Sequence, residues 1–174
     1  SCLVQDWQYW GEGKWGDKHP DKERYPDLKA LTDMLHDRGI SLMVSVWPNM
    51  NKGGQDNLEM MEDGKLYANL STYDAFDQEA RALYWKQCES EFFSGWTDAW
   101  WCDSTEPFTP DWNGARKRTD EERYEISAAE LTRYMDARKA NVYALYHAKG
   151  IHDNQRKADP ETRVANLTRS GYLS

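Results

Sequence analysis

The sequence lacks an excess of basic residues, a long apolar run and a cysteine framework, and each absence excludes a class of protein. Lys and Arg number 22 against 30 Asp and Glu, a formal net charge of -8, so we expect no phosphate-binding surface and no nucleic-acid partner. No stretch approaches the roughly 20 apolar residues that cross a bilayer, so we expect no membrane partner. The three cysteines, Cys2, Cys88 and Cys102, are an odd number at spacings that match no zinc motif. We expect buried thiols, with neither a disulfide framework nor a structural metal.

Aromatic residues are what the chain has in abundance. Nine Trp and ten Tyr among 174 residues supply flat amphipathic rings of the kind that line carbohydrate sites and protein interfaces. Composition does not choose between these two uses. The length is sufficient for one domain with a core, but it is shorter than the roughly 250 residues of a complete eight-stranded α/β barrel.

The pattern of apolar runs alternates strands and helices along the chain. Crossovers of the expected length favour parallel pairing, so we expect an α/β fold, either part of a closed barrel or an open doubly wound sheet. The glycines around Gly11 do not form the dinucleotide-binding fingerprint of the second architecture. Strands are expected at the start of 2–10 and over 40–47, 96–102 and 163–169; helices over 26–39, 74–93 and about 122–148, the last ended by Gly150; and a long loop over 51–69. The core contacts expected from the last helix are Leu131, Met135, Val142, Leu145 and Tyr146.

Polar and aromatic residues fall where the expected strands end. These residues are Asp6, Trp47, Asp103 and Arg169, and in a parallel barrel that edge carries the active site. Asp103 follows an aromatic run. A carboxylate beside indole rings suits sugar chemistry, because the rings cover the C–H faces of a pyranose while the acid attacks or stabilises the anomeric carbon. The alternative is that Asp103 only caps the turn after a strand.

Several motifs stand in one order along nearly the whole chain. They are Val4-Gln5-Asp6-Trp7-Gln8-Tyr9-Trp10, Tyr25-Pro26-Asp27, Leu35-His36, Met43-Val44-Ser45-Val46-Trp47-Pro48, Trp100-Trp101-Cys102-Asp103-Ser104-Thr105-Glu106-Pro107 and Leu167-Thr168-Arg169-Ser170. Together they resemble the catalytic domain of glycoside hydrolase family 31, the family of α-glucosidases and α-xylosidases. The resemblance implies a (β/α)8 TIM barrel, of which residues 1–174 form a partial catalytic domain covering roughly strands two to five. The family's N-terminal β-sandwich, first strand and later strands would then lie outside this chain.

The resemblance also implies roles for individual residues. Asp103 stands in the position of the catalytic nucleophile of a retaining mechanism. Asp6 resembles the acid that holds distal hydroxyls of the sugar in subsite -1, and Arg169 resembles the arginine that contacts the same ring and the catalytic carboxylates. Trp47 resembles a wall of that subsite, and Trp101 is assigned to substrate binding with it. The implied mechanism needs no metal and no organic cofactor.

The family's general acid/base is an aspartate in a Gly-Asp motif on the strand after Arg169, and this chain stops at Ser174 before reaching it. Glu106 is the alternative inside the chain, because the carboxyls of a retaining pair lie about 5–5.5 Å apart. A structural acid bound to loop backbone is the favoured interpretation of Glu106. We therefore expect residues 1–174 alone to be inactive.

Other residues receive structural interpretations. His36, His147 and His152 lie in or just after helical segments, and His147 and His152 lack carboxylate or cysteine neighbours at metal-ligand spacing. In the isolated chain, the missing strands are expected to leave the indoles of Trp47, Trp100 and Trp101 facing water.

The sequence thus predicts an exo-acting retaining α-glycoside hydrolase that acts on an oligosaccharide or α-glycoside. α-Xylosides are favoured, because the run 100–107 resembles α-xylosidase members more than the Trp-x-Asp-Met-Asn-Glu form common in α-glucosidases. An α-glucosidase is the first alternative. A non-catalytic carbohydrate-binding module, in which Asp103 only hydrogen-bonds a hydroxyl, is the second. A homo-oligomer of the intact enzyme and a cytoplasmic or periplasmic location are both left open.

Overall fold

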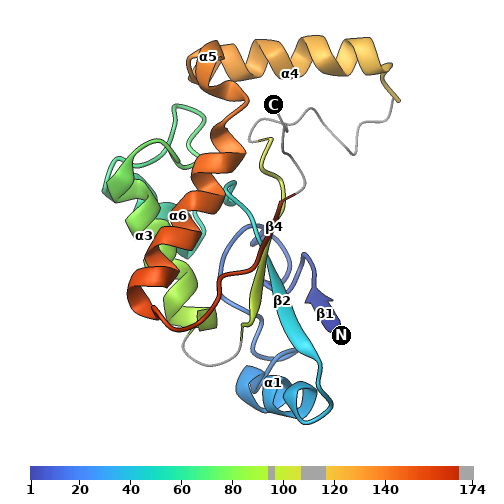
Figure 1. The fold of residues 1–174 in the computed structure, drawn as a ribbon. Coiled ribbons are helices and arrows are strands. Elements are labelled where there is room, and N and C mark those ends of the chain that lie inside the picture. Colours follow the sequence, from blue (N-terminus) through green and yellow to red (C-terminus); the bar gives the residue numbers. More distant parts are fainter. Residues whose placement is uncertain (94–96, 107–116, 169–174) are drawn as a thin grey trace.

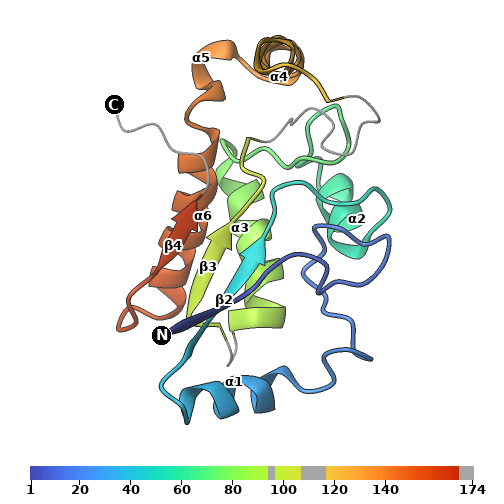
Figure 2. The ribbon, with the colours of Figure 1, turned by 90° about the vertical axis from the view of Figure 1, so that its right-hand side faces the viewer.

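Four parallel strands form the sheet of this protein, seen in a computed structural model that describes residues 1–93, 97–106 and 117–168. The sheet order follows the chain, β1-β2-β3-β4, and every neighbouring pair is parallel. Figure 2 shows β2, β3 and β4 side by side and pointing the same way. The expected parallel α/β arrangement is confirmed. The strands are β1 Cys2–Gln5, β2 Ser41–Val46, β3 Ala99–Cys102 and β4 Asn166–Thr168.

Helices connect the strands and cover one face of the sheet. Helices α3 and α6 lie side by side against β3 and β4 (Figure 1), whereas α4 lies beyond the C-terminal ends of the strands in both views. No helix among the described residues is long and apolar enough to cross a membrane. The helices are α1 Leu28–His36, α2 Gln55–Glu62, α3 Gln78–Cys88 with its π-helical continuation η1 Glu89–Phe93, α4 Asp120–Tyr134, α5 Ala137–Ala140 and α6 Tyr143–Ala158.

Local capping explains where α1 and α3 begin. The Asp27 carboxylate accepts a hydrogen bond from the Ala30 N–H at 2.8 Å and starts α1, as an N-cap does. The helix expected from residue 74 begins later, because Asp74 accepts from the Phe76 N–H at 2.9 Å in a turn and Asp77 is the N-cap of α3.

Two expectations about the helices are wrong. Helix α2 lies inside the expected loop 51–69. The single helix expected over about 122–148 is three helices, because Met135 is extended and the Asp136 carboxylate caps a new helix by accepting from the Arg138 N–H at 2.9 Å. Gly150 consequently lies within α6 rather than at a helix end.

The core lies between the sheet and helices α3 and α6. Trp100 on β3 is 1% exposed, and its indole N–H donates to the Gln155 side-chain oxygen on α6 at 2.8 Å. The expectation that Trp100 faces water is therefore wrong. Cys88 and Cys102 are buried as expected, whereas Cys2 is exposed, because β1 is an edge strand.

The contacts expected from the last helix are partly confirmed. Leu131, Met135 and Tyr146 pack against the core. Val142 and Leu145 are 37% and 62% exposed, because the break after Met135 reorients the following helices.

Candidate active site

The register of the sheet brings three of the predicted site residues to one edge. Val46 pairs with Cys102, so Trp47 and Asp103 follow directly after paired residues on neighbouring strands. Asp6 follows Gln5, which pairs with Val44. Arg169, predicted at the same edge, lies outside the described residues.

Alternation along the strands also places these residues on one face of the sheet. Trp100 and Cys102 face the helices and are buried. Successive side chains point to opposite faces, so Trp101 and Asp103 face away from the helices, as does Trp47 after β2. Both Trp101 and Asp103 are half-buried. Burial raises the pKa of the Cys102 thiol to about 12, so this neighbour of Asp103 stays protonated.

Indole donors lie on this face. The indole N–H groups of Trp47 and Trp101 are shielded from water and have no acceptor among the described residues. The Trp47 ring meets the buried Trp10 ring edge-on at 5.2 Å between centroids, which fixes its position. An indole ring on this face can pack against the C–H face of a sugar.

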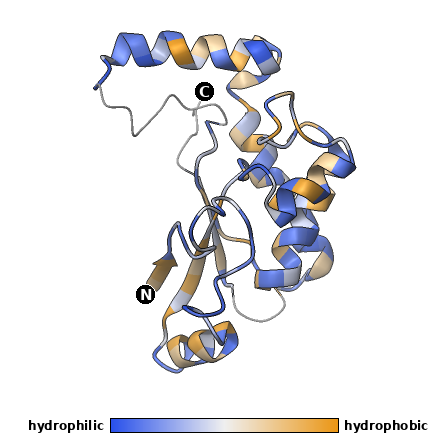
Figure 3. Ribbon diagram, turned by 180° about the vertical axis from the view of Figure 1, so that it is seen from behind, coloured by the Kyte–Doolittle hydropathy of each residue, from blue (hydrophilic) through white to orange (hydrophobic). Residues whose placement is uncertain are grey.

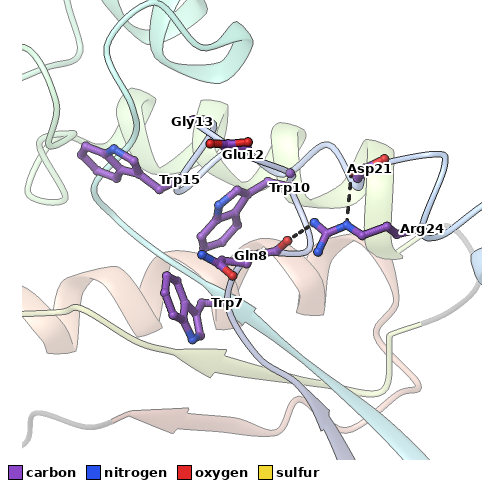
Figure 4. Close-up of a pocket in the computed structure, with 9 residues that line it drawn as sticks. Trp7, Gln8, Trp10, Glu12, Gly13, Trp15, Asp21 and Arg24 are labelled. Atoms are coloured by element: carbon purple, nitrogen blue, oxygen red, sulfur yellow. Dashed lines mark hydrogen bonds and ion pairs between the residues drawn. The ribbon is translucent and has the colours of Figure 1, made fainter.

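A cavity of about 520 Å³ opens directly after Asp6. Figure 4 shows three indoles, those of Trp7, Trp10 and Trp15, along it, with the Arg24 guanidinium directed at Gln8 and Asp21. The Arg24 Nε lies 3.2 Å from the Asp21 carboxylate, and its Nη2 donates to the Gln8 carbonyl. The cavity can take an apolar ring with hydroxyl groups. We did not predict it, although the glycine-rich aromatic loop 11–16 was the available signal.

A buried ion pair anchors this loop. Lys18 is fully buried, its ammonium lies 3.4 Å from Asp56 on α2, and it donates to the Gln87 side-chain oxygen on α3 at 3.1 Å. Its ammonium also lies 4.1 Å from the centre of the Tyr84 ring. This anchor was not predicted, because no local pattern links residues so far apart in the sequence.

His19 completes the anchor. It lies 3.2 Å from both Asp56 and Glu91. Burial alone would raise the pKa of Asp56, but Lys18 and His19 outweigh burial and hold this pKa at about 2. The hydrogen bond with Asp56 in turn raises the pKa of His19. The loop that carries the indoles is thus tied to α2 and η1 by paired charges.

The other histidines lie away from this edge. His147 is buried in α6 beside the Tyr73 hydroxyl at 2.8 Å, and burial lowers its pKa to about 3. His36 lies 2.9 Å from Asp98, just before β3 begins, and His152 is exposed. Glu106 is half-buried. Within the described residues, no group of acids, histidines or cysteines is arranged to hold a metal ion.

Comparison with known proteins connects this geometry to a family. A sequence model described as the glycosyl hydrolases family 31 TIM-barrel domain matches residues 1–174. The chain is 27% identical over 170 residues to an α-xylosidase of Saccharolobus solfataricus, covering 98% of this chain and 22% of that protein. It is 26% identical over 192 residues to an uncharacterized family 31 glucosidase, ORF2, of Pseudescherichia vulneris, covering 99% of this chain and 32% of that protein.

A solved structure from the same family has a similar fold. The crystal structure of the family 31 α-xylosidase of Xanthomonas citri aligns with a TM-score of 0.80 at 27% identity, covering 99% of this chain and 20% of that chain. The expected TIM-barrel architecture is confirmed by this likeness and by the match to the barrel domain. The chain therefore spans about a fifth of the length of the α-xylosidases that it resembles.

Proposed function

Because this chain belongs to glycoside hydrolase family 31, we propose that it is part of an exo-acting retaining α-glycosidase whose favoured substrates are α-xylosides. The observation that carries the proposal is the place of Asp103, directly after β3 at the C-terminal edge and beside Trp47 in the sheet register. Catalytic residues of TIM-barrel enzymes occupy this edge.

In the proposed mechanism Asp103 is the nucleophile. A carboxylate oxygen of Asp103 attacks the anomeric carbon, the bond to the leaving-group oxygen breaks, and its electron pair leaves with that oxygen, which is protonated by a general acid. Water then attacks the anomeric carbon of the resulting ester, and the bond from that carbon to the Asp103 oxygen breaks with its electron pair returning to the carboxylate. The same acid, now a base, takes the proton of that water. Two inversions retain the α configuration. We place the acid/base beyond Ser174, because the Gly-Asp motif of the family follows the Arg169 strand.

The remaining site residues bind the sugar in this proposal. Asp6 accepts hydrogen bonds from distal hydroxyls, and Arg169 contacts the same ring and the carboxylates. Trp47 and Trp101 form walls, a role supported by their place beside Asp103 at the C-terminal edge of β2 and β3. The cavity after Asp6 is lined by three further indoles, which in this proposal offer an additional surface for sugar binding.

Two substrates compete within the family. The likeness to the α-xylosidases of S. solfataricus and X. citri, each at 27% identity, favours xylosyl substrates. The likeness to the P. vulneris glucosidase at 26% favours glucosyl substrates. A xylosyl and a glucosyl unit differ by one hydroxymethyl group, a small difference for a pocket to exclude.

The experiment uses the full-length protein that contains this chain, assayed with an aryl α-xyloside and an aryl α-glucoside. We expect a higher kcat/KM for the xyloside, and NMR of the first sugar released should show the α anomer. A higher kcat/KM for the glucoside would establish the second substrate. Release of the β anomer would overturn the retaining mechanism.

A further inference from the structure

An amide side chain in the loop after β2 holds the residue that follows Asp103. The Asn49 Nδ2 donates to the Ser104 hydroxyl oxygen at 3.2 Å and approaches the Ser104 carbonyl oxygen at 3.4 Å. Ser104 has a φ of +53°, a left-handed conformation that is unfavourable for a residue with a Cβ. Contacts from outside the turn must therefore stabilise it, and Asn49 supplies them.

The orientation of the Asn49 amide is itself fixed. The Thr72 hydroxyl donates to the Asn49 Oδ1 at 2.5 Å and accepts from the Asn69 Nδ2 at 2.8 Å. An amide oxygen can only accept, so in the contact with the Asn49 Oδ1 the Thr72 hydroxyl is the donor. The amide oxygen therefore faces Thr72, and the amino group faces Ser104.

Thr72 stands on a rigid platform. It is fully buried, and its backbone forms an antiparallel bridge with Asn49. The Met50 N–H donates to the Ser71 carbonyl at 2.9 Å, and the Asn69 Oδ1 accepts from the Ser71 and Thr72 N–H groups at 3.1 and 3.0 Å. The segment 69–72 thus packs onto the loop after β2 and holds the Asn49 side chain in place.

Strand β2 and the loop after it hold the backbone on each side of the Asp103 side chain. The Asp103 N–H donates to the Val46 carbonyl at 3.2 Å, while Asn49 fixes Ser104. We propose that Asn49 is a positioning residue, which keeps Ser104 left-handed and thereby aims the Asp103 carboxylate at the anomeric carbon. This inference rests on the proposed function, in which Asp103 is the nucleophile. A displacement of 1 Å in such a group costs a factor of about 10² in rate.

The test compares two asparagines in the full-length protein. Asn49→Ala removes the donor to Ser104 and should lower kcat roughly ten- to a hundredfold, with KM changed by less than about threefold because substrate binding is kept. Asn154→Ala is the matched control. Its amide also donates to a backbone carbonyl, that of Gly150 at 2.8 Å on α6, but it contacts neither Ser104 nor the segment 69–72. We expect Asn154→Ala to leave kcat near wild type.

Two substitutions of Thr72 provide a second test. Thr72→Val removes the hydroxyl and should lower kcat in the same direction as Asn49→Ala, whereas Thr72→Ser keeps the hydroxyl and should retain activity. A kcat for Asn49→Ala within about threefold of wild type would overturn the proposal, since a misplaced nucleophile costs far more. So would equal losses of kcat in Asn49→Ala and Asn154→Ala, which would indicate general destabilisation.

Covalent labelling separates this inference from the proposed function. A 5-fluoroglycosyl fluoride should form an ester with Asp103 in the wild-type protein and should do so more slowly in Asn49→Ala. Equal labelling rates at Asp103 in both proteins would contradict the positioning role and leave the proposed function standing. A label on another wild-type residue would contradict the proposed function itself.

Discussion

At the scale of the residue, the proposed chemistry depends on Asp103 and on the groups that hold it. Its N–H is bound to the Val46 carbonyl of the neighbouring strand, and its strand neighbour Cys102 faces the opposite side, into the core. The proposed nucleophile therefore lies directly after a strand and is bonded to the neighbouring strand, and sites built on such elements are the more precise ones.

Replacement of this carboxylate is the first prediction. Asp103→Asn keeps the shape of the side chain but forms no stable ester, so kcat should fall below about a tenth of wild type while substrate binding is largely kept. The matched control is Asp98→Asn, the same change just before β3, where Asp98 contacts His36. Steady-state kinetics of both variants checks this. A kcat above about a tenth of wild type for Asp103→Asn would exclude Asp103 as the nucleophile.

The second prediction concerns His147 and acid. Its folded pKa of about 3 lies below the ordinary value of 6.5, so below pH 6.5 the unfolded chain binds a proton that the folded chain excludes. Stability is therefore lost as the pH falls from 6.5 towards 3, by about 2 kcal/mol at pH 5. His19 has the opposite shift, and its contribution changes only above pH 6.5.

Urea unfolding of the full-length protein at pH 7 and pH 5 measures this loss. His147→Asn keeps an acceptor for the Tyr73 hydroxyl but does not titrate, so its loss between the two pH values should be smaller by about 2 kcal/mol. His152→Asn, at an exposed position of the same helix, should behave as wild type. An unchanged pH dependence in His147→Asn would show that other groups cause the acid sensitivity.

Which residues could be predicted depends on whether their partners are local. Asp103, Trp47 and Asp6 follow apolar runs, so strand periodicity alone places them at one edge. Lys18 and Asp56 pair across 38 positions, and neither lies in an apolar pattern, so no sequence signal announces them. The choice of nucleophile over turn cap for Asp103 came from the family resemblance rather than from spacing.

At the scale of the element, the close contact of α3 and α6 explains why Gly150 is inside a helix. A Cβ at Gly150 would lie 2.8 Å from the Arg81 Cδ and 3.1 Å from the Arg81 Cβ. Both distances are shorter than a van der Waals contact. Gly150 is thus a packing residue, although glycine is more often found at helix ends.

The third prediction follows from this contact. Gly150→Ala would gain about 1 kcal/mol of helix propensity, but overpacking typically costs about 1–3 kcal/mol, so we expect net destabilisation in urea unfolding. In an Arg81→Ala background the contacts with Cδ and Cγ are removed and only the Cβ contact at 3.1 Å remains, so Gly150→Ala should cost clearly less than in the wild-type background. An equal cost in both backgrounds would show that the contact with Arg81 is not the cause.

The two wrong predictions about helices have physical causes. Helix α2 is short and polar, Gln55–Glu62, so it lacks the apolar stripe that identifies a helix. The break between α4 and α5 contains neither Gly nor Pro, and only the capping carboxylate of Asp136 marks it. The strands were predicted well because apolar runs mark them. Helix α1 was predicted well because Asp27 marks its start, apolar residues follow at helical spacing, and Gly39 marks its end.

At the scale of the whole molecule, the sheet has two open edges. Within the part of the chain that the structure describes, strands β1 and β4 each have one neighbour, and Leu3, Val4 and Leu167 on them are each 45% exposed. Figure 3 shows β1 as a hydrophobic strand at the rim. Open apolar edges favour association, which fits the proposal that residues 1–174 are roughly strands two to five of a longer barrel.

The fourth prediction is that residues 1–174 by themselves have no glycosidase activity and self-associate. The general acid is proposed to lie outside this chain, and acid assistance typically contributes about 10²–10⁴ in rate. Assays with activated aryl α-xylosides and α-glucosides, together with size-exclusion chromatography, check both statements. Robust turnover would mean that Glu106 or another acid within the chain donates the proton.

The most direct test of the account is to trap the covalent intermediate on the full-length protein. A 5-fluoroglycosyl fluoride loses fluoride as its anomeric carbon bonds to the attacking carboxylate, and the ester that forms is slow to hydrolyse. Mass spectrometry of the digested protein should show the sugar on the peptide that contains Asp103, and Asp103→Asn should remain unlabelled. Inactivation with the sugar on any other residue, or turnover without a labelled Asp103, would contradict the account.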